Sequence, residues 1–138
     1  MALLSYGELA LQAEHAVDEL RDEGYKVGAV KLRHFRPFPI EDIISVAKKL
    51  KVLGVFDRAT AFGSPTGGPV SSEVKSVLYN SGIKTPVLPI IAGLGGREVT
   101  VKQQKEDLKI LMKIKETGEF PKNLIHGTLW DGLLEVKK

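Results

Sequence analysis

Two glycine-rich loops carry the residues with most potential for chemistry. Each follows an apolar run and leads into a helical pattern, and a helix N-terminus offers free N–H groups to an anion. The candidate residues for anion binding or for an interface are Gly67, Gly68, Gly95, Gly96, Arg97 and Glu98. Neither loop completes the dinucleotide or P-loop pattern. The alternative, which the sequence favours, is that these glycines only form tight turns with positive φ.

A second candidate is the segment Arg33–Pro39, which combines two arginines, two phenylalanines and two prolines. Aromatic residues and arginine are enriched in protein interfaces, so Phe35, Arg36 and Phe38 are predicted interface residues. Alternatively, this segment is a connection whose phenylalanines fold back onto the core. The two interpretations are compatible.

The sequence predicts no catalytic, cofactor-binding or metal-binding residue. His15, His34 and His126 are far apart, and none has a ligand partner at metal spacing. The absence of cysteine excludes disulfides, thiolate zinc sites and cysteine-ligated iron–sulfur clusters. The acidic pair Glu41-Asp42 is explained by the dipole of the helix that it opens.

The composition is that of an ordinary globular domain, with 138 residues, 43% hydrophobic and 27% charged. The net charge is +3, but the lysines are spread along the chain, which argues against a nucleic-acid partner. No apolar run has the length of a membrane span, so no membrane partner is predicted. A cytoplasmic location is expected, and a homodimer is left open.

Apolar patterns alternate between short strands and helices. Strands are expected at Leu3–Ser5, 27–32, 52–56 and 87–92, the first of them as the end of a strand in a truncated chain. A first helix is expected after Ser5, because Ser5 and Glu8 have capping-box spacing. Further helices are expected after Pro39, after Pro69 and after Thr100. The predicted fold is an α/β three-layer open sandwich with a mostly parallel sheet and helices on both faces. The domain covers residues 1–118, and residues 119–138 form a tail packed on it.

Three loop motifs together resemble a known family, the α subunits of 2-oxoacid:ferredoxin oxidoreductases, and the pyruvate enzyme is the nearest match. The motifs are Phe35-Arg36-Pro37-Phe38-Pro39, then Asp57-Arg58 with Phe62-Gly63 and Gly67-Gly68-Pro69, and then the run from Gly93 to Thr100. Glu98 departs from the family pattern, in which aspartate is more usual. The resemblance covers about Leu3 to Thr100.

The resemblance implies the second domain of that subunit, similar to the C-terminal domain of transketolase. The whole enzyme would decarboxylate pyruvate oxidatively to acetyl-CoA and pass electrons to ferredoxin, with thiamine diphosphate, magnesium and iron–sulfur clusters. The family's catalytic glutamate, Gly-Asp-Gly motif and cluster cysteines have no match in this sequence. The isolated domain is therefore expected to be inactive and to serve assembly, with the remainder of the α subunit and the other subunits as partners.

Two alternatives remain open. The chain could come from another thiamine enzyme, such as a different 2-oxoacid:ferredoxin oxidoreductase or a transketolase. It could also be a small anion- or nucleotide-binding module that uses the glycine loops.

Overall fold

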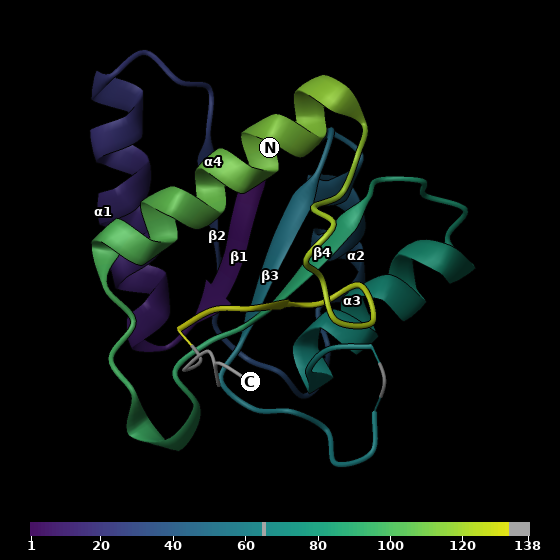
Figure 1. Cartoon of the computed structure of the whole chain (residues 1–138). Coiled ribbons are helices and arrows are strands. Elements are labelled where there is room, and N and C mark those ends of the chain that lie inside the picture. The colour runs from purple at the N-terminus through teal and green to yellow at the C-terminus, as the bar shows by residue number, and fades with distance from the viewer. Residues whose placement is uncertain (65, 133–138) are drawn as a thin grey trace.

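A five-stranded parallel sheet organises the molecule, as a computed structural model that describes residues 1–64 and 66–132 shows (Figure 1). The strand order is β2-β1-β3-β4-β5, and every neighbouring pair is parallel. The strands are β1 (Ala2–Tyr6), β2 (Gly28–Leu32), β3 (Leu53–Asp57), β4 (Val87–Ile91) and β5 (Leu129–Trp130). The helices are α1 (Glu8–Asp22), α2 (Ile40–Ala47), α3 (Pro69–Asn80), the short 3₁₀ helix η1 (Leu94–Gly96) and α4 (Val101–Thr117).

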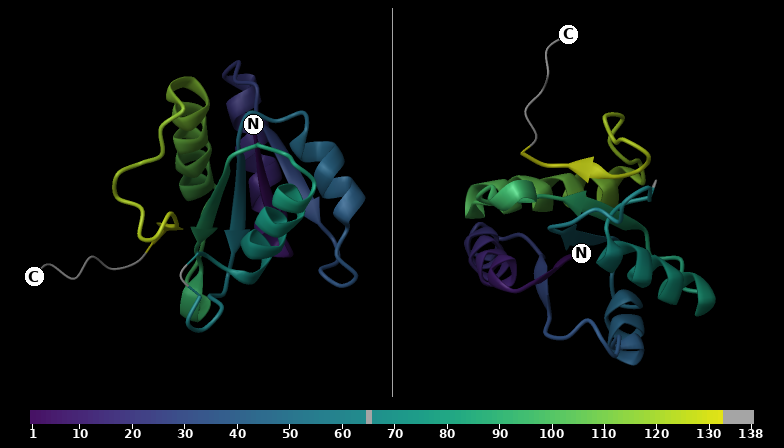
Figure 2. Two further views of the ribbon diagram at one scale, coloured as in Figure 1. Left: turned by 90° about the vertical axis from the view of Figure 1, so that its right-hand side faces the viewer. Right: turned by 90° about the horizontal axis from the view of Figure 1, so that it is seen from below.

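The helices cover both faces of the sheet, as the two views of Figure 2 show. Helices α1 and α4 pack on one face around a first core cluster that includes Leu3, Phe56 and Leu111. Helices α2 and α3 pack on the other face around a second cluster that includes Leu4 and Val55. Alternate residues of β1 and β3 thus supply the two cores, as expected for strands buried on both faces. The predicted α/β three-layer sandwich is confirmed.

The chain reverses its direction of travel across the sheet between β1 and β3. It moves outward from β1 to β2 and then crosses to the other side of β1 to form β3. Since all strands are parallel, their carboxyl ends share one edge, where open α/β sheets usually place their sites. No helix in the described residues is long and apolar enough to cross a membrane.

Most predicted helix and strand boundaries are confirmed, including the start of α4, and three predictions differ from the structure. Thr100 caps α4, because its Oγ1 accepts the N–H of Gln103 at 3.2 Å. The predicted capping box at Ser5 is wrong, because Ser5 lies inside β1 and Gly7 precedes α1 instead. The expected strand end at Leu3–Ser5 is a central strand of five residues. The chain also adds a fifth strand that its pattern did not predict.

Strand β5 and the turn after it attach the C-terminal segment to the sheet. The N–H of Asp131 donates to the carbonyl of Ile91 at 2.9 Å, and Leu129 is buried. Residues 119–132 thus contact the domain, while 133–138 lie outside the described residues, so the predicted packing of the tail as a whole stays a prediction.

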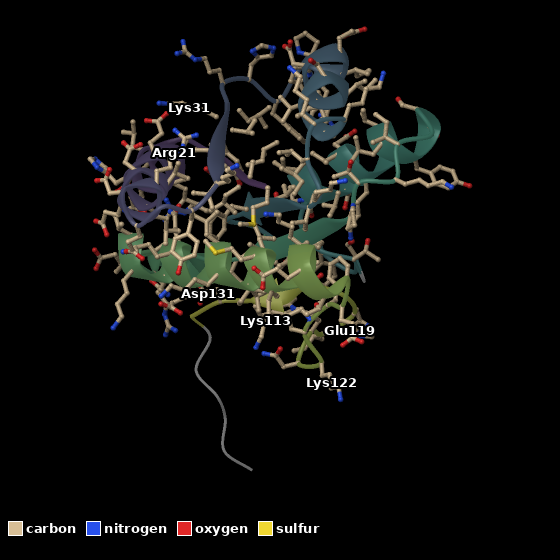
Figure 3. All side chains as sticks on the ribbon, turned by 90° about the horizontal axis from the view of Figure 1, so that it is seen from above. Arg21, Lys31, Lys113, Glu119, Lys122 and Asp131 are labelled. Atoms are coloured by element: carbon tan, nitrogen blue, oxygen red, sulfur yellow. The ribbon has the colours of Figure 1, made fainter. Side chains whose placement is uncertain are left out.

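A buried acid, Asp107, and a half-buried acid, Asp131, lie where this segment meets α4, beside which Figure 3 places Asp131. Asp107 is 3% exposed, and Oδ2 of both Asp107 and Asp131 is buried with no hydrogen-bond partner among residues 1–64 and 66–132. Burial raises the pKa of Asp107 to about 8, helped by the charges of Asp131 and Glu106. Burial also raises the pKa of Asp131. Asp107 is therefore mostly protonated at neutral pH.

We expect this pair to make the fold less stable as pH rises. Between the ordinary pKa of 3.8 and about 8, folded Asp107 keeps a proton that the unfolded chain releases. The free energy of unfolding should therefore fall by up to about 1.4 kcal/mol per pH unit in this window. Asp107→Asn mimics the protonated acid, so it should flatten this slope and be the more stable protein at pH 7 in urea denaturation.

The matched control is Glu106→Gln, which removes an exposed neighbouring charge and should leave most of the slope in place. An unchanged slope in Asp107→Asn would show that Asp107 is not the group that titrates.

Candidate interface and anion site at the carboxyl edge of the sheet

A buried carboxylate fixes the first glycine loop. Asp57, the last residue of β3, accepts the N–H of Val70 on Oδ1 at 2.9 Å and the N–H of Ser71 on Oδ2 at 3.0 Å. It therefore caps α3 from another element, and the positive end of the helix stabilises its charge. Burial raises the pKa of Asp57, and the hydrogen bonds from Ser71 and Val70 oppose that rise.

The glycines of this loop allow the backbone to approach Asp57. A Cβ on Gly68 would lie 2.3 Å from both Cβ and Cγ of Asp57 and 2.6 Å from the carbonyl oxygen of Ala59. The φ of Gly68 is −94°, which any residue can adopt, so the requirement is for space alone. Gly67 has a φ of +100°, and its Cβ would also meet Pro89. An anion at Gly67 and Gly68 would thus have to compete with Asp57, which already occupies two N–H groups of α3.

The second glycine loop brings charges of both signs together. Arg97 and Glu98 line a cavity of about 220 Å³ with Arg58 and Glu8, where the ends of β1 and β3 meet. The N–H of Arg58 donates to Tyr6 Oη at 3.1 Å, and its Nη1 lies 4.0 Å from Glu8 Oε2. Two arginines and two glutamates sum to no net charge, so this cavity suits a group that carries both charges better than a free phosphate.

Gly95 and Gly96 shape this second loop. Both have positive φ, 65° and 79°, and nothing lies within 4 Å of the Cβ that each would carry. They are therefore required by the tight turn and not by close packing. This geometry does not test whether Gly95 and Gly96 bind an anion, so their binding role stays a prediction.

The segment Arg33–Pro39 folds onto the domain and also presents charge to solvent. Phe35 and Phe38 are half-buried against the second core cluster and meet edge to face, with ring centroids 5.9 Å apart. The guanidinium of Arg36 lies 4.0 Å from the centroid of Phe35 and pairs with Glu73 of α3. The core interpretation holds for the phenylalanines, and Arg36 remains exposed for the predicted interface.

Phe62 is a residue at this edge that the sequence reasoning did not select. It is fully exposed, in the loop between β3 and α3. Its whole aromatic surface is thus available for contact with another surface, and aromatic residues are enriched in protein interfaces. The signal in the sequence that could have identified Phe62 is an aromatic residue in a polar, glycine-rich loop.

The side chains that could bind a metal ion or act in catalysis are dispersed over the described residues. Within residues 1–64 and 66–132, no group of three or more His, Asp or Glu side chains is placed to hold a metal ion. His15 and His34 are exposed on different elements, α1 and the loop after β2.

We expect Gly68→Ala to destabilise the domain by about 3 kcal/mol, because the methyl group must displace Asp57 or the backbone of Ala59. The control is Gly28→Ala, whose Cβ would meet no atom closer than 3.7 Å and which should be neutral or stabilising by about 0.5 kcal/mol. Thermal and urea unfolding measure both. Equal stability of the two variants would contradict the role of Gly68 in admitting Asp57.

Comparisons with known proteins all identify one family. The family model described as pyruvate:ferredoxin oxidoreductase core domain II matches residues 1–104. The chain is 42% identical over 130 residues to the pyruvate synthase subunit PorA of Pyrococcus horikoshii, which covers 94% of the chain and 31% of that protein. It is 40% identical over 121 residues to the ketoisovalerate oxidoreductase subunit VorA of the same organism, covering 88% of the chain and 30% of VorA.

A third relative is the alpha subunit of the NADH-dependent phenylglyoxylate dehydrogenase of Aromatoleum evansii, 38% identical over 100 residues. That match covers 72% of the chain and 24% of the relative. The chain thus spans less than a third of the length of the relatives that it matches.

Proposed function

The chain belongs to the family of the pyruvate:ferredoxin oxidoreductase core domain II, found in α subunits of 2-oxoacid:ferredoxin oxidoreductases, and from this we propose that it is a non-catalytic assembly domain. Its partners would be the remainder of the α subunit and the other subunits of a cytoplasmic enzyme. The whole enzyme would oxidise a 2-oxoacid such as pyruvate to its acyl-CoA and pass electrons to ferredoxin.

The carboxyl edge of the sheet is the observation that carries this proposal. Residues at this edge are engaged in holding loops, as Asp57 is, or are presented outward, as Phe62 and Arg36 are. Exposed aromatic and arginine side chains are typical of protein interfaces. An assembly role uses these features, whereas a catalytic role would need a reactive group among them.

The described residues do not fit the cofactors of the whole enzyme. A thiamine diphosphate site needs magnesium ligands and donors for the diphosphate. The N–H groups of Val70 and Ser71 are occupied by Asp57, and the cavity at Arg58 and Arg97 includes two glutamates that would repel a diphosphate. We therefore assign thiamine diphosphate, magnesium and the iron–sulfur clusters to other parts of the enzyme.

The choice of 2-oxoacid would also be made outside this domain. The chain is 42% identical to a subunit of a pyruvate synthase and 40% identical to a subunit of a ketoisovalerate oxidoreductase. Such similar values for enzymes named for different substrates favour a shared supporting domain.

A second candidate function is binding of a small anion, favoured by the convergence of Arg58 and Arg97 on one cavity. The two glutamates there weaken this candidate. Anion binding differs from assembly because it requires a small ligand and does not require a partner chain.

Titration of the chain separates these functions. Calorimetry with thiamine diphosphate and magnesium should show no binding heat, because the donors that the cofactor needs are absent or occupied. Phosphate and coenzyme A should leave the backbone amides of Gly95, Gly96 and Arg97 unshifted in NMR spectra. Tight binding of thiamine diphosphate would contradict the non-catalytic assignment, and amide shifts confined to that loop would favour the anion module.

Assembly itself is tested on Phe62 in the complete α subunit. Phe62→Ala should weaken its association with the remaining subunits by about tenfold or more, since buried aromatic anchors dominate interface energies. Tyr25→Ala is the control, because Tyr25 is an exposed aromatic residue between the end of α1 and β2, at the opposite edge of the sheet. Both affinities can be measured by analytical ultracentrifugation. An unchanged affinity for Phe62→Ala would exclude the loop that carries it as an interface.

A further inference from the structure

A groove of about 520 Å³ lies at the opposite, amino edge of the sheet, between the ends of α2 and α3. Lys48, Lys51 and Lys84 line it. Leu50 and Ile83 also line it, and both are partly buried against the second core cluster. The groove therefore combines a basic rim with an apolar base.

The positive charge of this groove is not neutralised. Acidic residues are absent from its lining, and in the described part of the chain none of its three lysines forms an ion pair. Other lysines do form such pairs, as Lys105 does with Glu19 and Glu23. Within the described residues, unpaired lysines also occur elsewhere, as at Lys113, but in this groove three of them meet in one hollow whose lining has no acid to balance them.

The walls of the groove are held in place by hydrogen bonds. Thr85 Oγ1 donates to the carbonyl of Ala47 at 2.8 Å and so joins the two walls. The N–H of Leu50 donates to the same carbonyl at 3.0 Å, and the N–H of Ile83 donates to Leu78 at 2.9 Å. A pre-formed surface of this kind loses little conformational entropy when it binds.

Helix dipoles account for only part of the lysine charge. Helices α2 and α3 end at Ala47 and Asn80. Each helix end carries roughly half a negative charge, so the two ends offset about one of the three lysines. The neighbouring Lys49 is exposed as well. A positive excess of about two charges or more therefore remains.

We propose that this groove docks an acidic segment of a partner protein, with carboxylates on Lys48, Lys51 and Lys84 and an apolar side chain on Leu50 and Ile83. Helix C-termini present carbonyl oxygens, which disfavour a phosphate ligand held deep in the groove. Lysines on flexible stems instead suit carboxylates spread over a surface. The exposed Tyr79, whose carbonyl accepts the N–H of Gly82, adds an aromatic side chain next to the groove.

The proposal is independent of the assembly function, which uses the other edge of the sheet. It is tested with the charge-reversed chain Lys48→Glu, Lys51→Glu and Lys84→Glu. The matched control reverses three exposed lysines that form no ion pair in the described residues, Lys102, Lys113 and Lys122. Figure 3 looks onto the amino edge and shows Lys113 and Lys122 on the α4 side of the molecule, away from α2 and α3.

The probe is a glutamate-rich peptide with one central leucine, measured by fluorescence anisotropy, and its glutamine counterpart. The groove variant should bind the glutamate peptide about tenfold more weakly, and the control variant should lose less than about threefold. Binding should weaken as ionic strength rises, and the glutamine peptide should not bind. The amide shifts of the parent chain should centre on Leu50 and Ile83.

Several results would overturn the proposal. Equal losses in the two variants would show attraction by overall charge, and amide shifts elsewhere would place the site elsewhere. Tighter binding of a single-stranded oligonucleotide, lost in the groove variant, would assign the groove to nucleic acid. A chain with the three lysines changed to glutamine, which removes charge without adding any, guards against misfolding and should also lose the peptide.

Discussion

The carboxylate of Asp57 at the N-terminus of α3 is the interaction on which the arrangement of the carboxyl edge depends. It joins the last residue of the central strand β3 to the first turn of the helix that follows. The helix offers unpaired N–H groups, and the chain fills that anion site with its own side chain. The contact requires Gly68 beside it, and the loop that carries Phe62 is closed at both ends by the same contact.

The two edges of the sheet differ in charge because of the topology. Every helix of a right-handed βαβ unit runs antiparallel to the strands, so helix N-termini gather at the carboxyl edge and C-termini at the amino edge. Acids accordingly lie at the first, as Glu8, Glu41 and Asp57 do. Lysines lie at the second, around the ends of α2 and α3. At the carboxyl edge the acids are matched by helix ends and arginines, whereas at the amino edge the lysines exceed what the helix ends can balance.

The sequence predicted the parts of the fold that depend on local pattern. Apolar periodicity, prolines and glycines identified four strands and four helices, because each uses signals within one turn or one strand. Strand β5 was missed because two residues carry no alternation. The role of Asp57 was missed because its partners are 13 and 14 residues away. The groove was missed because its lysines come from two segments that are only joined in space, at Ala47 and Thr85.

The glycine loops show why a motif alone could not decide between ligand binding and turn formation. Both interpretations need glycine after a strand and before a helix, so the spacing is the same in each. What separates them is the occupant of the helix N-terminus, which depends on a side chain outside the motif. At α3 that occupant is Asp57, and at α4 it is the hydroxyl of Thr100. Asp57 takes two N–H groups of α3, whereas Thr100 takes only that of Gln103 at α4, so an anion would meet more competition at the first loop than at the second. Phe62 in the first loop and Arg97 in the second are exposed, as side chains of protein interfaces are.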